Sequence, residues 1–272
     1  MTSNSPVREL ADGKLRVDRP AEHIVRLTIA NPAKRNALDH PILDAITTTL
    51  AELQSDVRCL IVTGSDGMFS AGYEIGDIAD QSNQEAAERL VAHPFLEAMQ
   101  ALADYPYPTL AVLPGHAIGG GLELALSCDL RIAADGIKLG MPPAKLGLVY
   151  SHTGLRRFID TIGAARTREL FLLGSYIEAD TALSWGLVNR VVPGAELEPA
   201  ARALAGELAG NAPLSQSGNK RVIEALLHAQ GELSEEMERE LIELRRASFD
   251  SHDMREGMSA FAEKRAPRWR GE

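Results

Sequence analysis

Several features that mark particular classes of protein are scarce in this sequence of 272 residues. Cysteine occurs only at Cys59 and Cys128, in apolar surroundings and without ligand-like spacing, which predicts two buried reduced thiols rather than a disulfide framework or a metal site. Basic residues number 28 against 38 acidic residues, and the formal charge of -10 repels polyanions and argues against nucleic-acid binding. The stretch "MTSNSPVREL" lacks the apolar region of a signal peptide, so we expect a cytoplasmic protein.

An uninterrupted membrane-spanning run is also missing. The stretch from Thr109 to Leu130 is long enough to span a bilayer, but Pro114, His116, several glycines and Glu123 interrupt it. It is better interpreted as a buried strand followed by a buried helix, and we expect no membrane partner. The hydrophobic content of 45% is ample for a folded core.

Strands and helices alternate over about the first 140 residues, which predicts parallel strands joined by helical crossovers. We expect strands in "HIVRLTIAN", "CLIVTG", "TLAVLPG", "LRIAADG" and "IKLGM", and helices over 38–54 and 85–102. Beyond residue 150 the pattern is mainly helical, over 164–172, 179–185, 197–208, 213–229 and 232–248, with one strand in "GLVNRVVPG". This order predicts an α/β core and a helical C-terminal region, which packs on the core or on another subunit.

The stretch "GGGLELALSCDL" places three glycines and one carboxylate in apolar surroundings. Gly119, Gly120 and Gly121 stand where a strand runs into a helix, and the first N–H groups of a helix have no partner within it. Together with the helix dipole, such donors stabilise negative charge on a ligand oxygen. Glu123 lies three residues beyond Gly120, on the same helix face. The alternative is that the glycines only allow tight packing and that Glu123 is an acid favourably placed in the first turn.

A second glycine turn follows the expected strand "CLIVTG", in "GMFSAGYEIGDI". Ala71, Gly72 and Tyr73 of this turn are candidates for another backbone donor. One donor alone would be a helix cap, whereas two converging donors would form an oxyanion hole. The glycine clusters match neither the Rossmann nor the Walker nucleotide-binding pattern.

Five blocks of the sequence resemble the crotonase superfamily, the enoyl-CoA hydratase/isomerase family, in order and spacing: "NPAKRNAL", "FSAGYEIGDI", "GHAIGGGLELALSCDLRIAA", "KLGLVYSHTGLRR" and "SWGLVNRVV". The resemblance runs from about Val25 to Arg268 and ends in "MREGMSAFAEKRAPRW", which is similar to that family's C-terminal helix. It implies a spiral core of repeated β-β-α units over residues 1–200 and a helical trimerisation region over residues 201–272. It also implies a homotrimer or a dimer of trimers, with coenzyme A as part of the substrate and no separate cofactor.

The resemblance assigns roles to particular positions. The thioester carbonyl is expected between the amide groups of Tyr73 and Gly120, which are also the turns singled out above. Coenzyme A is expected along the stretch "AKRNAL", beside Lys34, Arg35 and Ala37. Further positions expected to contact it are Ala71, Ile75, Phe261 and Lys264. Taken alone, each basic residue is better interpreted as a solvated surface charge.

Glu123 matches the first of two glutamates that flank a water in typical hydratases of the family. The second glutamate position is occupied by Pro143, whose side chain neither donates nor accepts a hydrogen bond. Tyr150 and His152 follow closely. Family members resembling methylmalonyl-CoA decarboxylase also have this proline and a tyrosine a few residues later, although they have a histidine at the position of Tyr73.

These residues leave three functions open. The resemblance first implies hydration of an enoyl-CoA with Glu123 as the sole glutamate. The alternatives are decarboxylation of a malonyl-type CoA, in which Tyr150 orients the carboxylate and an acid reprotonates Cα, and an acyl-CoA-binding module without catalysis. Tyr150 is otherwise a half-buried aromatic residue with a satisfied hydroxyl, and His152 a structural or surface residue. For Glu74 and Asp77 the sequence favours solvated loop carboxylates, and a replacement acid on the opposite wall of the site is the alternative.

Overall fold

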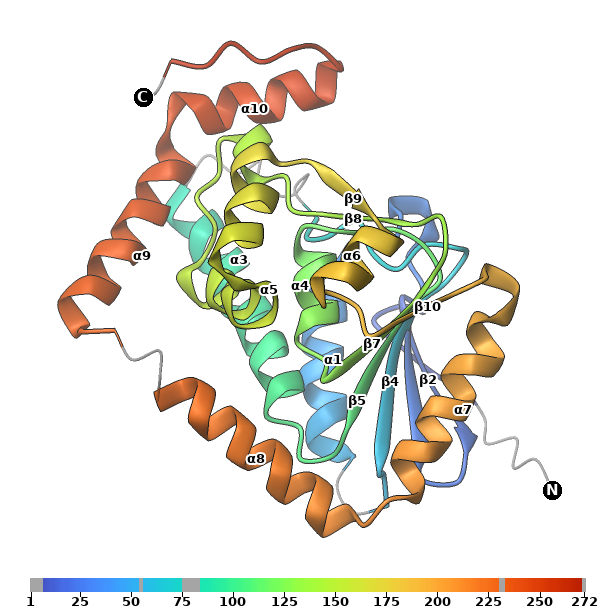
Figure 1. Ribbon diagram of the computed structural model, residues 1–272. Helices are drawn as coiled ribbons and strands as arrows, with labels where there is room; N and C mark the ends of the chain where they lie inside the picture. Colours follow the sequence, from blue (N-terminus) through green and yellow to red (C-terminus); the bar gives the residue numbers. More distant parts are fainter. Residues whose placement is uncertain (1–6, 54–55, 75–83, 230–232, 271–272) are drawn as a thin grey trace.

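The computed structural model describes residues 7–53, 56–74, 84–229 and 233–270. A seven-stranded sheet forms the centre of this part of the chain, in the order β1-β2-β3-β4-β5-β7-β10 (Figure 1). Its strands are β1 (Arg8–Leu10), β2 (Leu15–Ala21), β3 (Ile24–Ile29), β4 (Cys59–Gly64), β5 (Thr109–Leu113), β7 (Leu130–Ala134) and β10 (Arg190–Val192). From β3 to β10 every neighbouring pair is parallel, as the alternation of strands and helices predicts.

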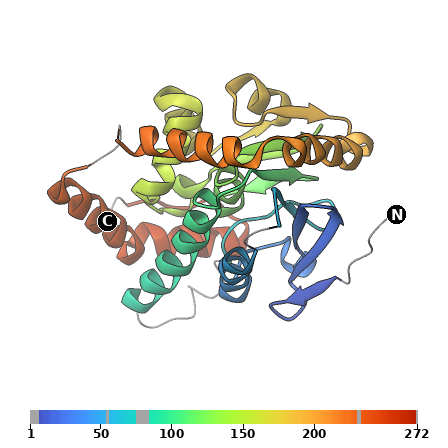
Figure 2. The ribbon, with the colours of Figure 1, turned by 90° about the horizontal axis from the view of Figure 1, so that it is seen from below.

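Helices cover both faces of this sheet. Figures 1 and 2 show α1 (His40–Glu52) and α3 (Gln84–Ala103) on one face and α7 (Leu197–Gly210) on the other. Because both faces are covered, β5 is buried along its whole length. The helix α7 runs across residue 200, where the sequence places the boundary of the C-terminal region, and packs Ala201 and Leu204 into the core. That division of the chain stays a prediction.

A second, three-stranded sheet supports the turns that carry the candidate site. It consists of β6 (Ala117–Ile118), β8 (Lys138–Gly140) and β9 (Tyr176–Glu178), with β8 in the middle. The strand β6 leads directly into α4 (Gly120–Leu126), which carries Glu123. The remaining helices of this region are α5 (His152–Leu173) and α6 (Ala179–Trp185).

The C-terminal helices run round the outside of the core (Figure 1). They are α8 (Pro213–Ala229), α9 (Glu235–Asp250) and α10 (His252–Glu263). The inner side of α10 packs so closely on the 3-10 helix η2 (Pro143–Leu146) that a Cβ atom at Gly257 would lie 2.6 Å from the carbonyl oxygen of Leu146. Within the described ranges, none of the helices combines the length and the apolar character needed to cross a bilayer.

Most elements expected from the sequence are present, with a few differences. The hairpin of β1 and β2 and the short strands β6 and β9 were not expected, and the helix expected over 164–172 is the second half of α5. Gly163 has φ 75° and ψ 163°, so α5 consists of two helices that meet at this residue. Cys59 and Cys128 are both buried free thiols, as expected, and burial raises the pKa of each to about 12.

Candidate active site

Two glycine turns meet at the start of α4. Ser70 and Ala117 form a parallel bridge, and the Ile118 amide donates to the Ser70 carbonyl at 3.0 Å. Gly72 has φ +98°, and a Cβ atom there would lie 2.7 Å from the Ile118 oxygen. A Cβ atom at Gly121 would lie 2.6 Å from the Ser70 oxygen. The turns therefore approach each other closely because these positions have no side chain.

This approach places the amides of Tyr73 and Gly120 next to each other. A Cβ atom at Gly120 would lie 3.3 Å from the Tyr73 nitrogen. Gly120 is the first residue of α4, so its N–H has no acceptor within the helix. In the other turn, the Ala71 amide donates to the Arg35 carbonyl at 3.0 Å and the Gly72 amide to Ser70 Oγ at 3.1 Å. The arrangement places the Tyr73 amide, and not that of Ala71 or Gly72, beside Gly120.

Glu123 lies on the first turn of α4 and is only 1% exposed. The Tyr150 hydroxyl donates a short hydrogen bond to Glu123 Oε2, whereas Oε1 has no hydrogen-bond partner within the described part of the chain. Burial raises the pKa of Glu123, and the hydrogen bond from Tyr150 and the positive charges of Arg157 and Arg245 oppose this effect. Glu123 is thus a buried acid with one oxygen held and the other available, rather than a solvated acid at a helix start.

Tyr150 is held from two sides so that its hydroxyl faces Glu123. Its ring packs edge-on against Phe171, with ring centroids 5.4 Å apart. On the α5 side, a Cβ atom at Gly154 would lie 2.6 Å from Tyr150 Cε1 and 2.9 Å from Glu123 Oε1. Burial and the neighbouring Glu123 raise the pKa of Tyr150 well above its ordinary value. Tyr150 therefore stays protonated and acts as a hydrogen-bond donor.

The expected position of a second glutamate contains no acid. Pro143 is buried and begins the 3-10 helix η2. Among the described residues, no group of three His, Cys, Asp or Glu side chains is arranged to hold a metal ion. At the start of α4 the described part of the chain thus combines the Glu123 carboxyl group, the Tyr150 phenol and the two neighbouring amides.

Glu74 is not the solvated loop carboxylate that the sequence favours. Its side chain is 11% exposed and forms an ion pair with Lys34, which is 40 positions earlier in the chain. The Glu74 amide also donates to the Leu38 carbonyl at 3.0 Å. The charge of Lys34 is therefore neutralised locally in this structure. Asp77 and Ile75 lie outside the described residues.

The other positions assigned to coenzyme A are dispersed. Arg35 is exposed and Ala37 is 8% exposed, in the loop before α1. Phe261 is 73% exposed on α10, and Lys264 is exposed at the end of that helix. His152 begins α5, and its Nε2 lies 3.7 Å from Glu238 Oε1, which agrees with the structural alternative.

Sequence reasoning missed three residues that shape the site. Gly154 leaves space for the Glu123–Tyr150 pair. Phe95 lies against Gly120, where a Cβ atom would be 2.9 Å from Phe95 Cε2. His40 Nε2 is 2.6 Å from the Tyr73 hydroxyl. Gly154 stands in the block "KLGLVYSHTGLRR" but was given no role, whereas Phe95 and His40 stand in no motif, and only their proximity in space identifies them.

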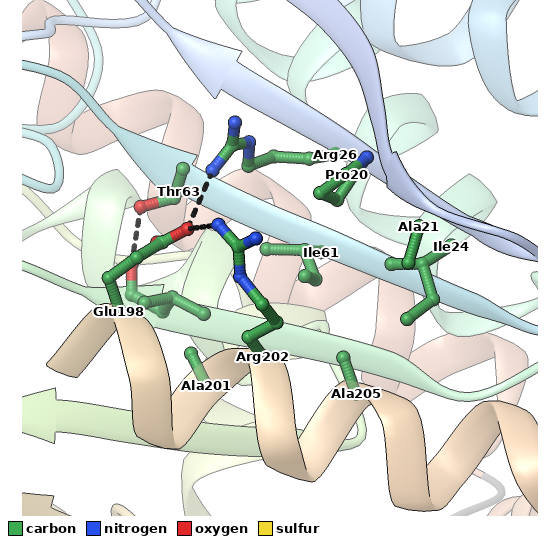
Figure 3. A pocket seen from close by; sticks show the side chains of 11 residues that line it. Pro20, Ala21, Ile24, Arg26, Ile61, Thr63, Glu198, Ala201, Arg202 and Ala205 are labelled. Atoms are coloured by element: carbon green, nitrogen blue, oxygen red, sulfur yellow. Dashed lines mark hydrogen bonds and ion pairs between the residues drawn. The ribbon is translucent and has the colours of Figure 1, made fainter. Parts of the chain in front are cut away.

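A separate small cavity lies between α7 and the sheet (Figure 3). Its volume is about 20 Å³, which is enough for about one water molecule. Glu198 at its edge is bonded to both Arg26 and Arg202. None of the candidate site residues lines this cavity, so it is distinct from the site on α4.

The sequence and the fold are similar to those of known proteins over nearly their whole length. The profile of a family described as "Enoyl-CoA hydratase/isomerase" matches residues 19–272. The probable enoyl-CoA hydratase echA8 of Mycobacterium bovis is 37% identical, over 89% of this chain and 93% of that protein. Carnitinyl-CoA dehydratase of Salmonella typhi is 33% identical, over 91% of this chain and 95% of that protein. A solved structure of methylmalonyl-CoA decarboxylase in complex with 2-nitronate-propionyl-CoA has a TM-score of 0.86 and 29% sequence identity. The match covers 95% of this chain and 99% of that one.

Proposed function

Because the chain belongs to the enoyl-CoA hydratase/isomerase family, we propose that it is a lyase that acts on acyl-CoA thioesters through an enolate. The observation that carries this proposal is the hydrogen bond from Tyr150 to the buried Glu123, which lies on the helix whose first amide borders the Tyr73 amide. The two amides would hold the thioester oxygen and stabilise the negative charge that develops on it. Each such donor is worth roughly 3 kcal/mol of barrier in other enzymes.

Of the lyase reactions, decarboxylation of a malonyl-type thioester fits the chemistry of this site best. The bond between Cα and the carboxylate carbon breaks, CO2 leaves, and the electron pair passes to the thioester as an enolate. No base is needed for this step, and none stands at Pro143. Glu123, whose pKa is raised, then delivers a proton to Cα and regains one from solvent. With Glu123 protonated, the Tyr150 hydroxyl would accept from the Glu123 carboxyl group and turn its own proton to the leaving carboxylate, which it would orient.

Hydration of an enoyl-CoA is the second candidate, favoured by the names of several relatives, including the 37% identical protein of Mycobacterium bovis. In this reaction Glu123 alone would activate the water that adds to Cβ, while the proton reaches Cα. Tyr150 would hold the water where family hydratases use a second glutamate. A raised pKa makes the Glu123 carboxylate a stronger base, but a smaller fraction of the protein then has Glu123 ionised. The rate of hydration would therefore increase with pH.

Assays with methylmalonyl-CoA and crotonyl-CoA separate the candidates. We expect CO2 release from methylmalonyl-CoA and a loss of most of this activity in Tyr150→Phe. Tyr176→Phe is the matched control, because Tyr176 is 53% exposed and lies outside the site. Turnover of crotonyl-CoA alone would assign the hydratase reaction. Tight binding of both thioesters without turnover, extended over a panel of acyl chains, would indicate the acyl-CoA-binding module instead.

We also propose that the protein assembles as a homotrimer or a dimer of trimers. Supporting this, α8 exposes large apolar side chains that are costly to leave in water: Leu214, Val222, Ile223 and Leu226. Light scattering coupled to size-exclusion chromatography measures the assembly directly. Substituting Val222 and Leu226 with aspartate is expected to reduce the mass to that of one chain, about 29.4 kDa, and a monomeric wild-type protein would contradict the proposal.

The coenzyme A contacts remain part of the same proposal. Lys34 would exchange its partner Glu74 for an anionic group of coenzyme A, with Arg35, Ala37 and Ala71 along the same loop. Phe261 and Lys264 would cover the ligand, in the same chain or from a neighbouring subunit. A cytoplasmic location also stays a proposal, since one relative, from Dictyostelium discoideum, is named as mitochondrial.

A further inference from the structure

The Tyr73 amide depends for its position on one short stretch, Leu38 to His40. The Leu38 amide donates to the Gly72 carbonyl at 2.8 Å, and the Glu74 amide donates to the Leu38 carbonyl at 3.0 Å. Leu38 and Tyr73 thus form a parallel bridge. Two residues later, His40 Nε2 lies 2.6 Å from the Tyr73 hydroxyl. The same stretch therefore holds Tyr73 by its backbone and by its side chain.

His40 is itself fixed by the start of α1. It is the first residue of that helix, and Asp39 is the N-cap, whose Oδ1 accepts from the Ile42 amide at 3.0 Å. Asp39 Oδ2 also forms an ion pair with Lys14 at 2.6 Å, and Asp39 is 7% exposed. A capped helix start with a partly buried ion pair is a rigid support for a side chain. His40 is therefore held in place by its own helix and can fix the position of Tyr73.

Aromatic contacts continue from His40 to the other oxyanion donor. The Tyr73 ring lies 6.1 Å from the His40 ring and packs edge-on against Phe95, with centroids 6.3 Å apart. Phe95 in turn occupies the space that a Cβ atom at Gly120 would enter. Side-chain contacts therefore connect Tyr73 to Gly120, in addition to the proximity of the two amides. The distance between the two donors depends on this set of contacts.

We propose that His40 is a positioning residue for the oxyanion hole: it holds Tyr73 so that the Tyr73 amide and the Gly120 amide converge on one oxygen. The inference rests on the proposed function, because it assumes that these amides hold a thioester oxygen. Charge on that oxygen is greatest in the enolate. Loss of the contact therefore weakens binding of the enolate more than binding of the neutral thioester.

The test is a double-mutant cycle with His40→Ala and Tyr73→Phe. Each removes the same hydrogen bond, so we expect each to lower kcat about 5- to 10-fold with little change in KM, as for a single lost hydrogen bond. The double variant should lose no more than either single variant. His40→Gln, which keeps a polar group near the position of Nε2, should restore most of kcat. Asp44→Ala is the control, since Asp44 is exposed on the same helix and should leave kcat unchanged.

Binding of two probes provides a readout that does not depend on turnover. In 2-nitronate-propionyl-CoA the negative charge spreads towards the thioester oxygen, whereas propionyl-CoA is neutral. We expect wild type to prefer the nitronate and His40→Ala to lose about 5- to 10-fold of that preference. Equal affinity of wild type for both probes would count against the proposed function itself. A preference that His40→Ala leaves intact, additive losses in the cycle, or an effect on KM alone would overturn the role of His40 only.

Discussion

Replacing Tyr150 by phenylalanine removes one hydroxyl and leaves the rest of the site in place. The ring keeps its edge-on contact with Phe171, and Gly154 keeps the space open. Glu123 Oε2 loses its donor, so neither oxygen of this 1% exposed carboxyl group then has a hydrogen-bond partner in the described part of the chain. The variant therefore tests how much one donor contributes to a buried acid.

The size of the effect depends on whether Glu123 is charged. A hydrogen bond to an ionised group contributes roughly 1.5–3 kcal/mol to stability, and one between neutral groups about 0.5–1.5 kcal/mol. We therefore expect Tyr150→Phe to lower the free energy of unfolding by about 1 kcal/mol where Glu123 is protonated and by about 2 kcal/mol where it is ionised. The difference between the two conditions, about 1 kcal/mol, is the quantity to measure.

The direction of the pH dependence follows from burial. Burial raises the pKa of Glu123 in the folded state, so the folded protein binds this proton more tightly than the unfolded chain does. That contribution to stability is complete below the ordinary pKa of glutamate and is lost as the pH rises through the folded pKa. Without Tyr150 the folded pKa rises further, so the loss extends to higher pH. The alkaline limb of the decarboxylation rate, which requires protonated Glu123, should move in the same direction.

Urea unfolding at a series of pH values from the ordinary pKa of glutamate upward, together with rate profiles over the same series, measures both effects. Tyr176→Phe controls for loss of a hydroxyl outside the site, and should change neither. If Tyr150→Phe destabilised the protein equally at every pH value of the series, the hydrogen bond would not be linked to the charge of Glu123. If the alkaline limb of the rate profile of Tyr150→Phe moved to lower pH, the assignment of Glu123 as the acid would be refuted as well.

Three further outcomes are expected. Glu123→Gln should lower turnover about 100-fold or more, as for loss of a general acid. Thermal unfolding should show little loss of stability, because a buried ionisable group is replaced by a neutral one. Unchanged turnover would mean that Glu123 is not the acid. Gly120→Ala should lower kcat about 100-fold with a folded circular-dichroism spectrum, because its Cβ atom would lie 2.9 Å from the Phe95 ring and 3.3 Å from Tyr73 N, so the ring edge and the Tyr73 amide must both shift slightly. Full activity would exclude a thioester oxygen at this position. Cys59 and Cys128 should not react with Ellman's reagent in the native protein near pH 8, because burial raises their pKa to about 12, and rapid labelling before unfolding would contradict this.

The sequence predicts those parts of the fold that have a local signal. Apolar runs closed by glycine predict β4 and β5, and the five blocks predict membership of the family, which the comparisons confirm. The turns at Gly72 and Gly120 are also expected from their glycines. Short β9 has no such signal, because Tyr176–Glu178 forms a strand only through pairing with β8.

Contacts between distant residues were predictable only as candidates. Tyr150 is 27 positions from Glu123, and their hydrogen bond depends on how the start of α5 packs against α4. The ion pair of Lys34 with Glu74 likewise joins residues that are far apart in the sequence. For this reason Glu74 was wrongly expected to be solvated. His40 has no motif around it, and its contact with Tyr73 arises from the bridge at Leu38.

The close approach of the two glycine turns divides the site into a part that tolerates little variation and a part that can vary. At Gly72 and Gly121 any side chain would collide with backbone oxygen atoms, which cannot move aside as a flexible side chain can. Pro143 and Tyr150 lie outside this contact, on a 3-10 helix and in the loop that follows it. A mutant library designed to change the reaction would therefore keep the turns constant and randomise positions 143 and 150. New proton-handling groups could then be selected there without loss of the turns that we propose hold the thioester.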